Sequence, residues 1–120
     1  MFDADAIATA YLAAWNAREP AVRRGAIAKV WTETGSYLDP LMEGEGHAGL
    51  DRMIAAAQAQ FPGLRFTLKG QPEIHHDRIR FSWSLAPDGG APVAHGTDFA
   101  VVAEDGRLQS VTGFLDQGVA

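Results

Sequence analysis

The chain has 120 residues, a net charge of -5 and no cysteine. This length supports one hydrophobic core, and we expect residues 1–120 to form a single domain. The acidic balance argues against nucleic-acid binding, which needs a basic surface, and the lack of thiols excludes disulfides, thiolate chemistry and cysteine-based zinc sites.

The first third of the chain is predicted to be helical. Apolar residues recur at helical spacing over residues 3–17. Glu19-Pro20 ends that pattern and starts a second helix, because proline suits the first helical turn. The apolar stripe of the second helix runs from Val22 to Trp31, so Arg23 is expected to face water.

A short strand is predicted around residues 35–40, between the second and third helices. Gly35 opens this apolar and aromatic run, and Pro40 closes it because proline cannot donate to a continuing ladder. Alternation puts Tyr37 and Asp39 on one face of the strand. An acid beside an aromatic is a poor lining for a dry core, so this face is predicted to line a pocket.

The rest of the chain is predicted to contain one helix and then strands. The glycine-rich segment 43–47 is expected to be a turn, followed by a third helix over residues 48–61. Strands are expected over residues 64–69, 73–85 with a turn at His76-Asp77, 93–103 and 108–115, with an interruption at 70–72. Segregated helices and strands predict an α+β fold, with three N-terminal helices packed on a strongly curved, mostly antiparallel sheet around a conical cavity.

Asp98 is the second unusual acid, because it lies in the middle of the strand predicted over residues 93–103. Its face also carries small or apolar residues, namely Ala94, Gly96, Ala100 and Val102. An unpaired buried carboxylate is costly, so Asp98 is paired, protonated or on the outer face. The pattern leaves both faces open, since the opposite set, His95, Thr97, Phe99 and Val101, is an equally plausible inner face.

The histidines do not form a metal-binding pattern. His75 and His76 are adjacent, so on a strand they would point to opposite sides. No histidine pair has metal-ligand spacing, and no carboxylates complete a set, so we expect neither a metal nor a cofactor. A hydrolase or dehydratase that uses His75 or His95 would need that side chain inside the cone.

Large aromatic side chains are numerous for a small domain: Tyr11, Trp15, Trp31, Tyr37 and Trp83. They form either an ordinary core or the lining of a cavity for an apolar ligand.

Three stretches together resemble the nuclear transport factor two-like superfamily, and within it the SnoaL-like group of polyketide cyclases, near the ketosteroid isomerases. They are residues 11–17, 37–40 and 96–99. The resemblance implies a cone-shaped α+β barrel that covers almost the whole chain. It leaves the function open, because this fold hosts isomerases, dehydratases, cyclases, epoxide hydrolases and plain binding or dimerisation modules.

The ketosteroid isomerase pattern, placed on this chain, implies three catalytic residues. Asp39 would be the general base, while Tyr11 and a protonated Asp98 would donate to the oxyanion, as in the isomerase itself, where an apolar site keeps such a carboxyl group neutral. The ligand-binding residues expected around them are Trp15, Trp31, Tyr37, Phe81, Trp83, Val111, Gly113 and Leu115.

Two functions follow from these residues. The first is a cofactor-free enzyme of the isomerase or cyclase type, which transfers a proton next to the carbonyl of a small apolar molecule. The alternative is a non-catalytic ligand-binding or dimerisation domain, with Phe99 and Phe114 favouring a homodimer through the sheet face. A buried Asp98 beside Tyr11 would favour the enzyme.

The expected location is the cytoplasm, without membrane contact. No apolar run approaches the ~20 residues that span a membrane. The N-terminus carries Asp3 and Asp5 rather than the basic residues of a signal peptide.

Overall fold

The computed structural model describes residues 2–116. The helices in this part of the chain are α1 (Ala4–Asn16), α2 (Pro20–Val30) and α3 (Gly46–Gln60). The strands are β1 (Trp31–Leu38), β2 (Glu43–Glu45), β3 (Leu64–His75), β4 (Arg78–Pro87), β5 (Ala94–Val102) and β6 (Leu108–Leu115). They form one sheet in the order β2-β1-β6-β5-β4-β3. Only β1 and β6 pair in parallel among these strands.

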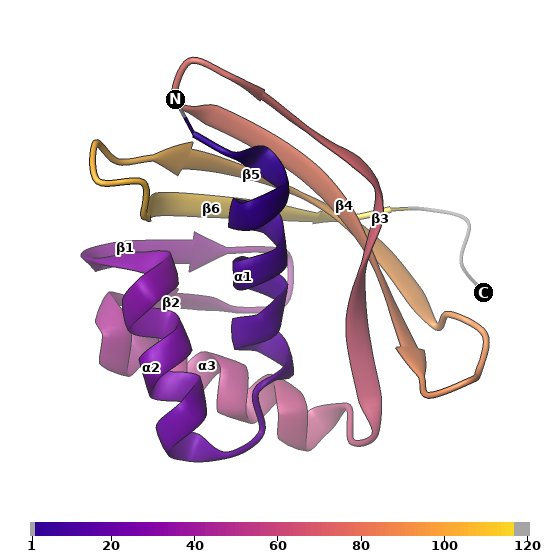
Figure 1. Ribbon diagram of the computed structural model, residues 1–120. Coiled ribbons are helices and arrows are strands. Elements are labelled where there is room, and N and C mark those ends of the chain that lie inside the picture. The colour runs from indigo at the N-terminus through magenta and orange to yellow at the C-terminus, as the bar shows by residue number, and fades with distance from the viewer. Residues whose placement is uncertain (1, 117–120) are drawn as a thin grey trace.

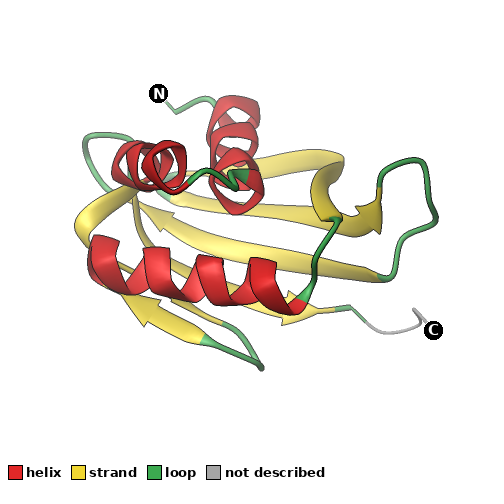
Figure 2. Cartoon of the chain, turned by 90° about the horizontal axis from the view of Figure 1, so that it is seen from below, coloured by secondary structure: helices red, strands yellow, loops and turns green. Residues whose placement is uncertain are grey.

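The predicted α+β architecture is confirmed. All three helices lie on one side of the strongly curved sheet, and α1 crosses in front of its strands (Figure 1). Figure 2, which views the molecule from below, shows α3 running alongside the sheet, with α1 and α2 on the same side. The sheet curves around the helices without closing, because β2 and β3 remain its two edges. The fold is therefore an open cone. None of the helices within residues 2–116 has the length and apolar character that crossing a membrane requires.

The break predicted at residues 70–72 is absent, because β3 continues through it. The β3–β4 register shifts between Lys69 and Glu73, and Gly70 has a φ of 72°. Three residues of β3 therefore lie opposite one residue of β4. Such an irregularity absorbs extra residues and bends a strand without ending it, and glycine tolerates the positive φ. The long β3–β4 ribbon therefore bends along the sheet edge (Figure 1).

Two expectations about α2 are wrong. Trp31 begins β1 rather than closing the helix. Arg23 does not face water, since it is only 6% exposed while Val22 is 60% exposed. The Arg23 Nε donates to Asp51 Oδ1 at 2.7 Å, and this ion pair joins α2 to α3. A charge can be buried when a partner with good geometry satisfies it, and that partner lies too far along the chain for helical periodicity to reveal.

Residues 43–45 form strand β2 rather than the predicted turn. They pair antiparallel with β1, from Ser36 opposite Glu45 to Leu38 opposite Glu43. Gly44 permits this position beneath α3, because a Cβ at Gly44 would meet the Gly49 carbonyl oxygen at 3.1 Å. A strand of three residues is too short to show alternation.

The structure settles which face of β5 points inward. Asp98 is 1% exposed, while the neighbouring Phe99 is 40% exposed. Gly96 lies on the inner face with Asp98, and a Cβ there would overlap the ring of Trp83 at 2.1 Å. Trp83 therefore lies flat against β5 beside Asp98. The outer-face alternative for Asp98 is excluded.

Candidate active site

A cavity of about 410 Å³ lies between α1, the inner face of the sheet and the end of α3. Seven of the predicted site residues line it: Tyr11, Trp15, Tyr37, Asp39, Trp83, Asp98 and Leu115. The remaining lining is apolar: Leu12, Leu41, Met42, Ala57, Phe61, Phe66, Leu85, Val93 and Ala94. No lysine, arginine or histidine belongs to the lining formed by residues 2–116. The cavity therefore combines two carboxyl groups with an aromatic and aliphatic wall.

The first polar pair in this cavity is Tyr11 with Asp98. Both side chains are buried, and the Tyr11 hydroxyl donates to Asp98 Oδ2 at 2.7 Å. The other oxygen, Asp98 Oδ1, has no hydrogen-bond partner among the described residues. Burial raises the pKa of Asp98 from 3.8 to about 6, helped by the charges of Asp39 and Asp116, while the Tyr11 hydroxyl bonded to it and the nearby indole of Trp83 act in the opposite direction.

The helix α1 holds Tyr11 in place. Tyr11, Leu12 and Trp15 share the buried side of this helix, whose N-terminus is capped by Asp3 accepting from the Ala6 N–H at 3.1 Å. Burial, and then the charge of Asp98, raise the pKa of the Tyr11 hydroxyl well above its usual value. Tyr11 therefore stays a neutral hydrogen-bond donor at physiological pH.

The second polar pair is Tyr37 with Asp39, at the end of β1. The Tyr37 hydroxyl donates to Asp39 Oδ2 at 2.6 Å. Asp39 Oδ1 accepts from the backbone N–H groups of Leu41 at 2.7 Å and Met42 at 2.9 Å. This is the side-chain-to-backbone turn that an aspartate before a proline forms readily. Asp39 is half-buried and holds three donors, whereas Asp98 is fully buried and holds one.

Gly113 of β6 lies where the two pairs converge. A Cβ built on this glycine would meet the Tyr37 hydroxyl oxygen at 2.7 Å, Asp98 Oδ1 at 2.9 Å and the Asp39 Cβ at 3.2 Å. Gly113 also lies directly opposite Asp98 in the β5–β6 register. Polar atoms from both pairs thus crowd one point above a residue that has no side chain to separate them.

Four predicted ligand-binding residues do not belong to the cavity lining. They are Trp31, Phe81, Val111 and Gly113, all of which are buried. Trp31 and Phe81 pack on the ring of Tyr11, with centroid separations of 5.4 and 5.1 Å. These two rings therefore contact Tyr11 from behind and do not face the cavity. Sequence alternation identifies inward residues, but it does not distinguish the first layer of a cavity from the layer behind it.

Phe66 and the 41–42 turn line the cavity although they were not among the predicted site residues. Phe66 makes edge contacts with Trp15 and Trp83, at centroid separations of 5.5 and 5.1 Å. The inward alternation of β3 was a usable signal for Phe66. Leu41 and Met42 carried no such signal, because they lie in a turn without periodicity.

The indole of Trp15 adds an unused donor. Trp15 is buried and lines the cavity, yet its Nε1 has no hydrogen-bond partner among residues 2–116. Buried indole N–H groups usually find an acceptor. Two lining residues therefore carry a buried polar atom without a hydrogen-bond partner, Trp15 Nε1 and Asp98 Oδ1, and the Trp15 indole lies near enough to the Tyr11 hydroxyl to lower its pKa slightly against the effect of burial.

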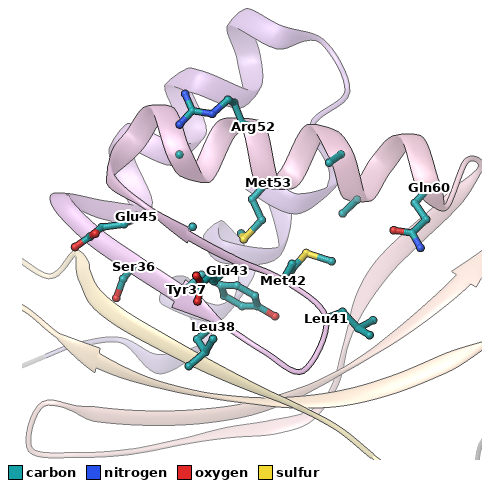
Figure 3. Close-up of a pocket in the computed structure, with 14 residues that line it drawn as sticks. Ser36, Tyr37, Leu38, Leu41, Met42, Glu43, Glu45, Arg52, Met53 and Gln60 are labelled. Carbon is teal, nitrogen blue, oxygen red and sulfur yellow. The ribbon is translucent and has the colours of Figure 1, made fainter.

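An open groove of about 890 Å³ lies on the other side of the 41–42 turn, between α3 and the β1–β2 pair. Figure 3 shows Met53 descending from α3 toward Met42 and Tyr37, with Arg52 higher on the helix. Tyr37, Leu41 and Met42 border both this groove and the inner cavity. They form the wall between the two spaces.

The four histidines, all within the described residues, lie outside the cavity lining. His75 and His76 are exposed at the β3–β4 turn, where His76 has a φ of 51°. His95 contacts Ser84 through its Nδ1 at 3.0 Å. No set of three His, Cys, Asp or Glu side chains within residues 2–116 is arranged to hold a metal ion. The cavity acids therefore have no histidine partner.

Comparisons with known proteins identify the family. A profile of the SnoaL-like domain matches residues 8–111. Among solved structures, a candidate isomerase of the SnoaL-like family from Agrobacterium tumefaciens is 46% identical, with a TM-score of 0.90 over 94% of this chain and 97% of that one. A candidate SnoaL-like polyketide cyclase from Jannaschia is 16% identical, with a TM-score of 0.68 over 92% of this chain and 85% of that one; it shares the fold.

A SnoaL-like protein of unknown function from Burkholderia thailandensis also shares the fold, at 15% identity and a TM-score of 0.73 over 94% of each chain. The comparison with curated proteins gives no match. The profile covers most of the chain, and the cone-shaped fold agrees with it. The chain belongs to the SnoaL-like domain family.

Proposed function

We propose that this protein is a cofactor-free enzyme that transfers a proton next to the carbonyl of a small, apolar, uncharged molecule. The observation that carries the proposal is the buried Asp98, which lines the cavity with one oxygen unpaired. Its pKa of about 6 lies close to physiological pH, as an efficient acid–base catalyst requires. The candidate isomerase from Agrobacterium tumefaciens, at 46% identity, supports the same reaction class.

Asp98 is the proposed proton-transferring group, although the sequence pattern assigns the base to Asp39. Asp39 already accepts three hydrogen bonds, from Tyr37 and two backbone N–H groups. These donors fix its orientation and occupy most of its lone pairs. Asp98 accepts one hydrogen bond among the described residues, from the Tyr11 hydroxyl, and its unpaired Oδ1 is the oxygen that we assign to the substrate.

The proposed step moves one proton and one electron pair. Ionised Asp98 Oδ1 takes a proton from the carbon next to the carbonyl, and the electron pair of that C–H bond moves onto the carbonyl oxygen as an enolate. Asp98 then returns the proton to another carbon of the enolate, which completes an isomerisation. The unpaired N–H of Trp15 is the proposed donor to the enolate oxygen, since a donor aimed at developing charge lowers the barrier.

The shape and charge of the cavity define the class of substrate. A volume of about 410 Å³ is near the lower end of the ~300–1,000 Å³ of ligand pockets. The lining has no cationic side chain within the described residues and contains two carboxyl groups, so it disfavours carboxylate or phosphate substrates. Cyclic ketones with one or two rings match both conditions.

The test follows conjugation of β,γ-unsaturated cyclic ketones by ultraviolet absorbance, beginning with cyclohex-3-enone. Asp98→Asn should lower the rate by roughly 10²- to 10⁴-fold, the usual contribution of a general base, with the fold retained by circular dichroism. Asp39→Asn should lower it much less. A wild-type rate equal to that of Asp98→Asn for every ketone would reject the enzyme proposal.

We further propose a homodimer through the outer face of the sheet. Leu38, Phe99 and Phe114 are all exposed. Thr112 pairs with both Leu38 and Phe99, and Phe114 lies two residues further along β6, so the three side chains share this face. An exposed apolar patch on a sheet is typical of an isologous interface. Light scattering should give a dimer mass that falls to the monomer in Phe99→Ser/Phe114→Ser; an unchanged mass would contradict this interface.

A further inference from the structure

The candidate proton-transfer group has no direct access to water. Asp98 is 1% exposed, and a bound substrate would fill the remaining cavity. Tyr11, packed against it from α1, cannot carry the proton away, because its buried hydroxyl donates back to Asp98 Oδ2 and has no second acceptor among the described residues. If the proton on Asp98 is to exchange with solvent during turnover, another polar group must accept it.

Tyr37 is placed to be that group. Its hydroxyl oxygen and Asp98 Oδ1 both crowd the point above Gly113, at 2.7 and 2.9 Å from a Cβ built there. A tyrosine hydroxyl can accept one hydrogen bond while it donates another. Tyr37 already donates, to Asp39 Oδ2 at 2.6 Å. Its acceptor lone pairs have no donor among the side chains of the described residues, and Asp98 Oδ1 has no partner either.

We propose that Tyr37 relays protons between Asp98 and Asp39, and that Gly113 keeps the space in which the relay forms. This inference rests on the proposed function of Asp98. Protonated Asp98 Oδ1 donates to the Tyr37 oxygen, and Tyr37 in turn donates to Asp39 Oδ2. All four carboxyl oxygens of the two acids are then paired, including the one that has no partner in the resting structure.

The relay moves a proton from Asp98 to Asp39 and leaves Tyr37 chemically unchanged. The Oδ1–H bond of Asp98 breaks as a new O–H bond forms on Tyr37. At the same time the original hydroxyl proton of Tyr37 passes to Asp39 Oδ2, so Tyr37 stays neutral throughout. Asp39 is half-buried at the end of β1, and it releases the proton to water. A solvent proton then returns along the same path in reverse, so that Asp98 is protonated again before it passes the proton to the enolate.

Gly113 is the positioning residue of this relay. Any side chain at position 113 would overlap the Tyr37 oxygen and Asp98 Oδ1, and would separate the two atoms between which the proton moves. The inner face of β6 next to Asp98 therefore needs a residue without a Cβ.

The relay is tested by the isotope content of the product. Conjugation of cyclohex-3-enone in D₂O is followed by NMR at early times, before free product exchanges with solvent. With the relay intact, Asp98 exchanges its proton for a deuteron before returning it, so the newly protonated carbon should carry mostly deuterium. In Tyr37→Phe and Asp39→Asn, whatever their rates, the product should keep the hydrogen of the substrate, with at least a fivefold lower deuterium content.

Tyr11→Phe is the matched control, because it removes the same hydroxyl group from the other side of Asp98. It should lower the rate but leave the deuterium content at the wild-type level. A Tyr37→Phe product as deuterated as that of the wild type would overturn the relay, as would a wild-type product without deuterium. Both results leave conjugation itself intact, whereas a wild-type protein that does not conjugate any ketone removes the proposed function and the relay together.

Discussion

The two acid–tyrosine pairs of the cavity have the same chemical groups and opposite surroundings. Tyr11 and Asp98 come from α1 and β5, 87 residues apart, and both are buried. Tyr37 and Asp39 are two residues apart, at the end of β1 and just after it, and Asp39 is half-buried. The Tyr11–Asp98 pair therefore forms only when the chain folds, whereas the Tyr37–Asp39 pair forms largely through local structure.

The two acids therefore differ in hydrogen bonding and in contact with solvent. Asp39 accepts three hydrogen bonds and is partly exposed to solvent. Asp98 accepts one hydrogen bond and has almost no contact with solvent, so burial destabilises its charged form and raises its pKa to about 6. Donor count and burial, rather than residue type, distinguish the two carboxyl groups.

The largest expected effect concerns the charge of Asp98. Its pKa rises from 3.8 in the unfolded chain to about 6 in the fold. The folded protein therefore binds more protons than the unfolded chain between about pH 4 and 6, and stability falls as pH rises through this window, by about 3 kcal/mol. Asp98→Asn should remove this loss.

Chemical denaturation at half-unit steps from pH 4 to 7 measures the effect. The difference in unfolding free energy between wild type and Asp98→Asn should change by that amount across the window, whatever constant offset the amide introduces. Two parallel curves would show that Asp98 keeps an ordinary pKa.

The next effect comes from the point where the pairs meet. Gly113→Ala inserts a Cβ against Tyr37 and Asp98, and overpacking of this kind costs about 1–3 kcal/mol. Gly25→Ala is the matched control, because nothing lies within 4 Å of a Cβ at this helical position. That change should stabilise the protein by about 0.5–1 kcal/mol. Thermal unfolding measures the change in stability of both variants. Equal changes would show that the space above Gly113 accommodates a methyl group.

The sequence predicts the local features of this molecule well. The three helices, the four strands after them, the His76-Asp77 turn and the end of β1 just before Asp39 all follow from short-range patterns. The pocket-facing side of β1 is likewise correct, because alternation over four residues needs no tertiary information.

Features that depend on distant partners could not be predicted in the same way. The inward direction of Asp98 is set by Tyr11, and the burial of Arg23 by Asp51 on another helix. Either face of β5 satisfies alternation equally as the inner face, and the family resemblance alone favoured the face that carries Asp98. The convergence on Gly113 was beyond reach, since it depends on the stagger of three strands.

The smallest expected effect compares the two tyrosines. Tyr11→Phe removes the single donor of Asp98 and leaves a buried acceptor unsatisfied, which costs about 1–3 kcal/mol at pH 7. Tyr37→Phe should cost less than about 1 kcal/mol, because Asp39 keeps two backbone donors and contact with water. Urea denaturation of both variants gives the difference directly. The loss of the Tyr11 hydrogen bond destabilises the charged form of Asp98, so the difference in unfolding free energy between the two variants should become smaller below pH 6. A difference that does not change with pH would show that Tyr11→Phe acts through lost packing instead.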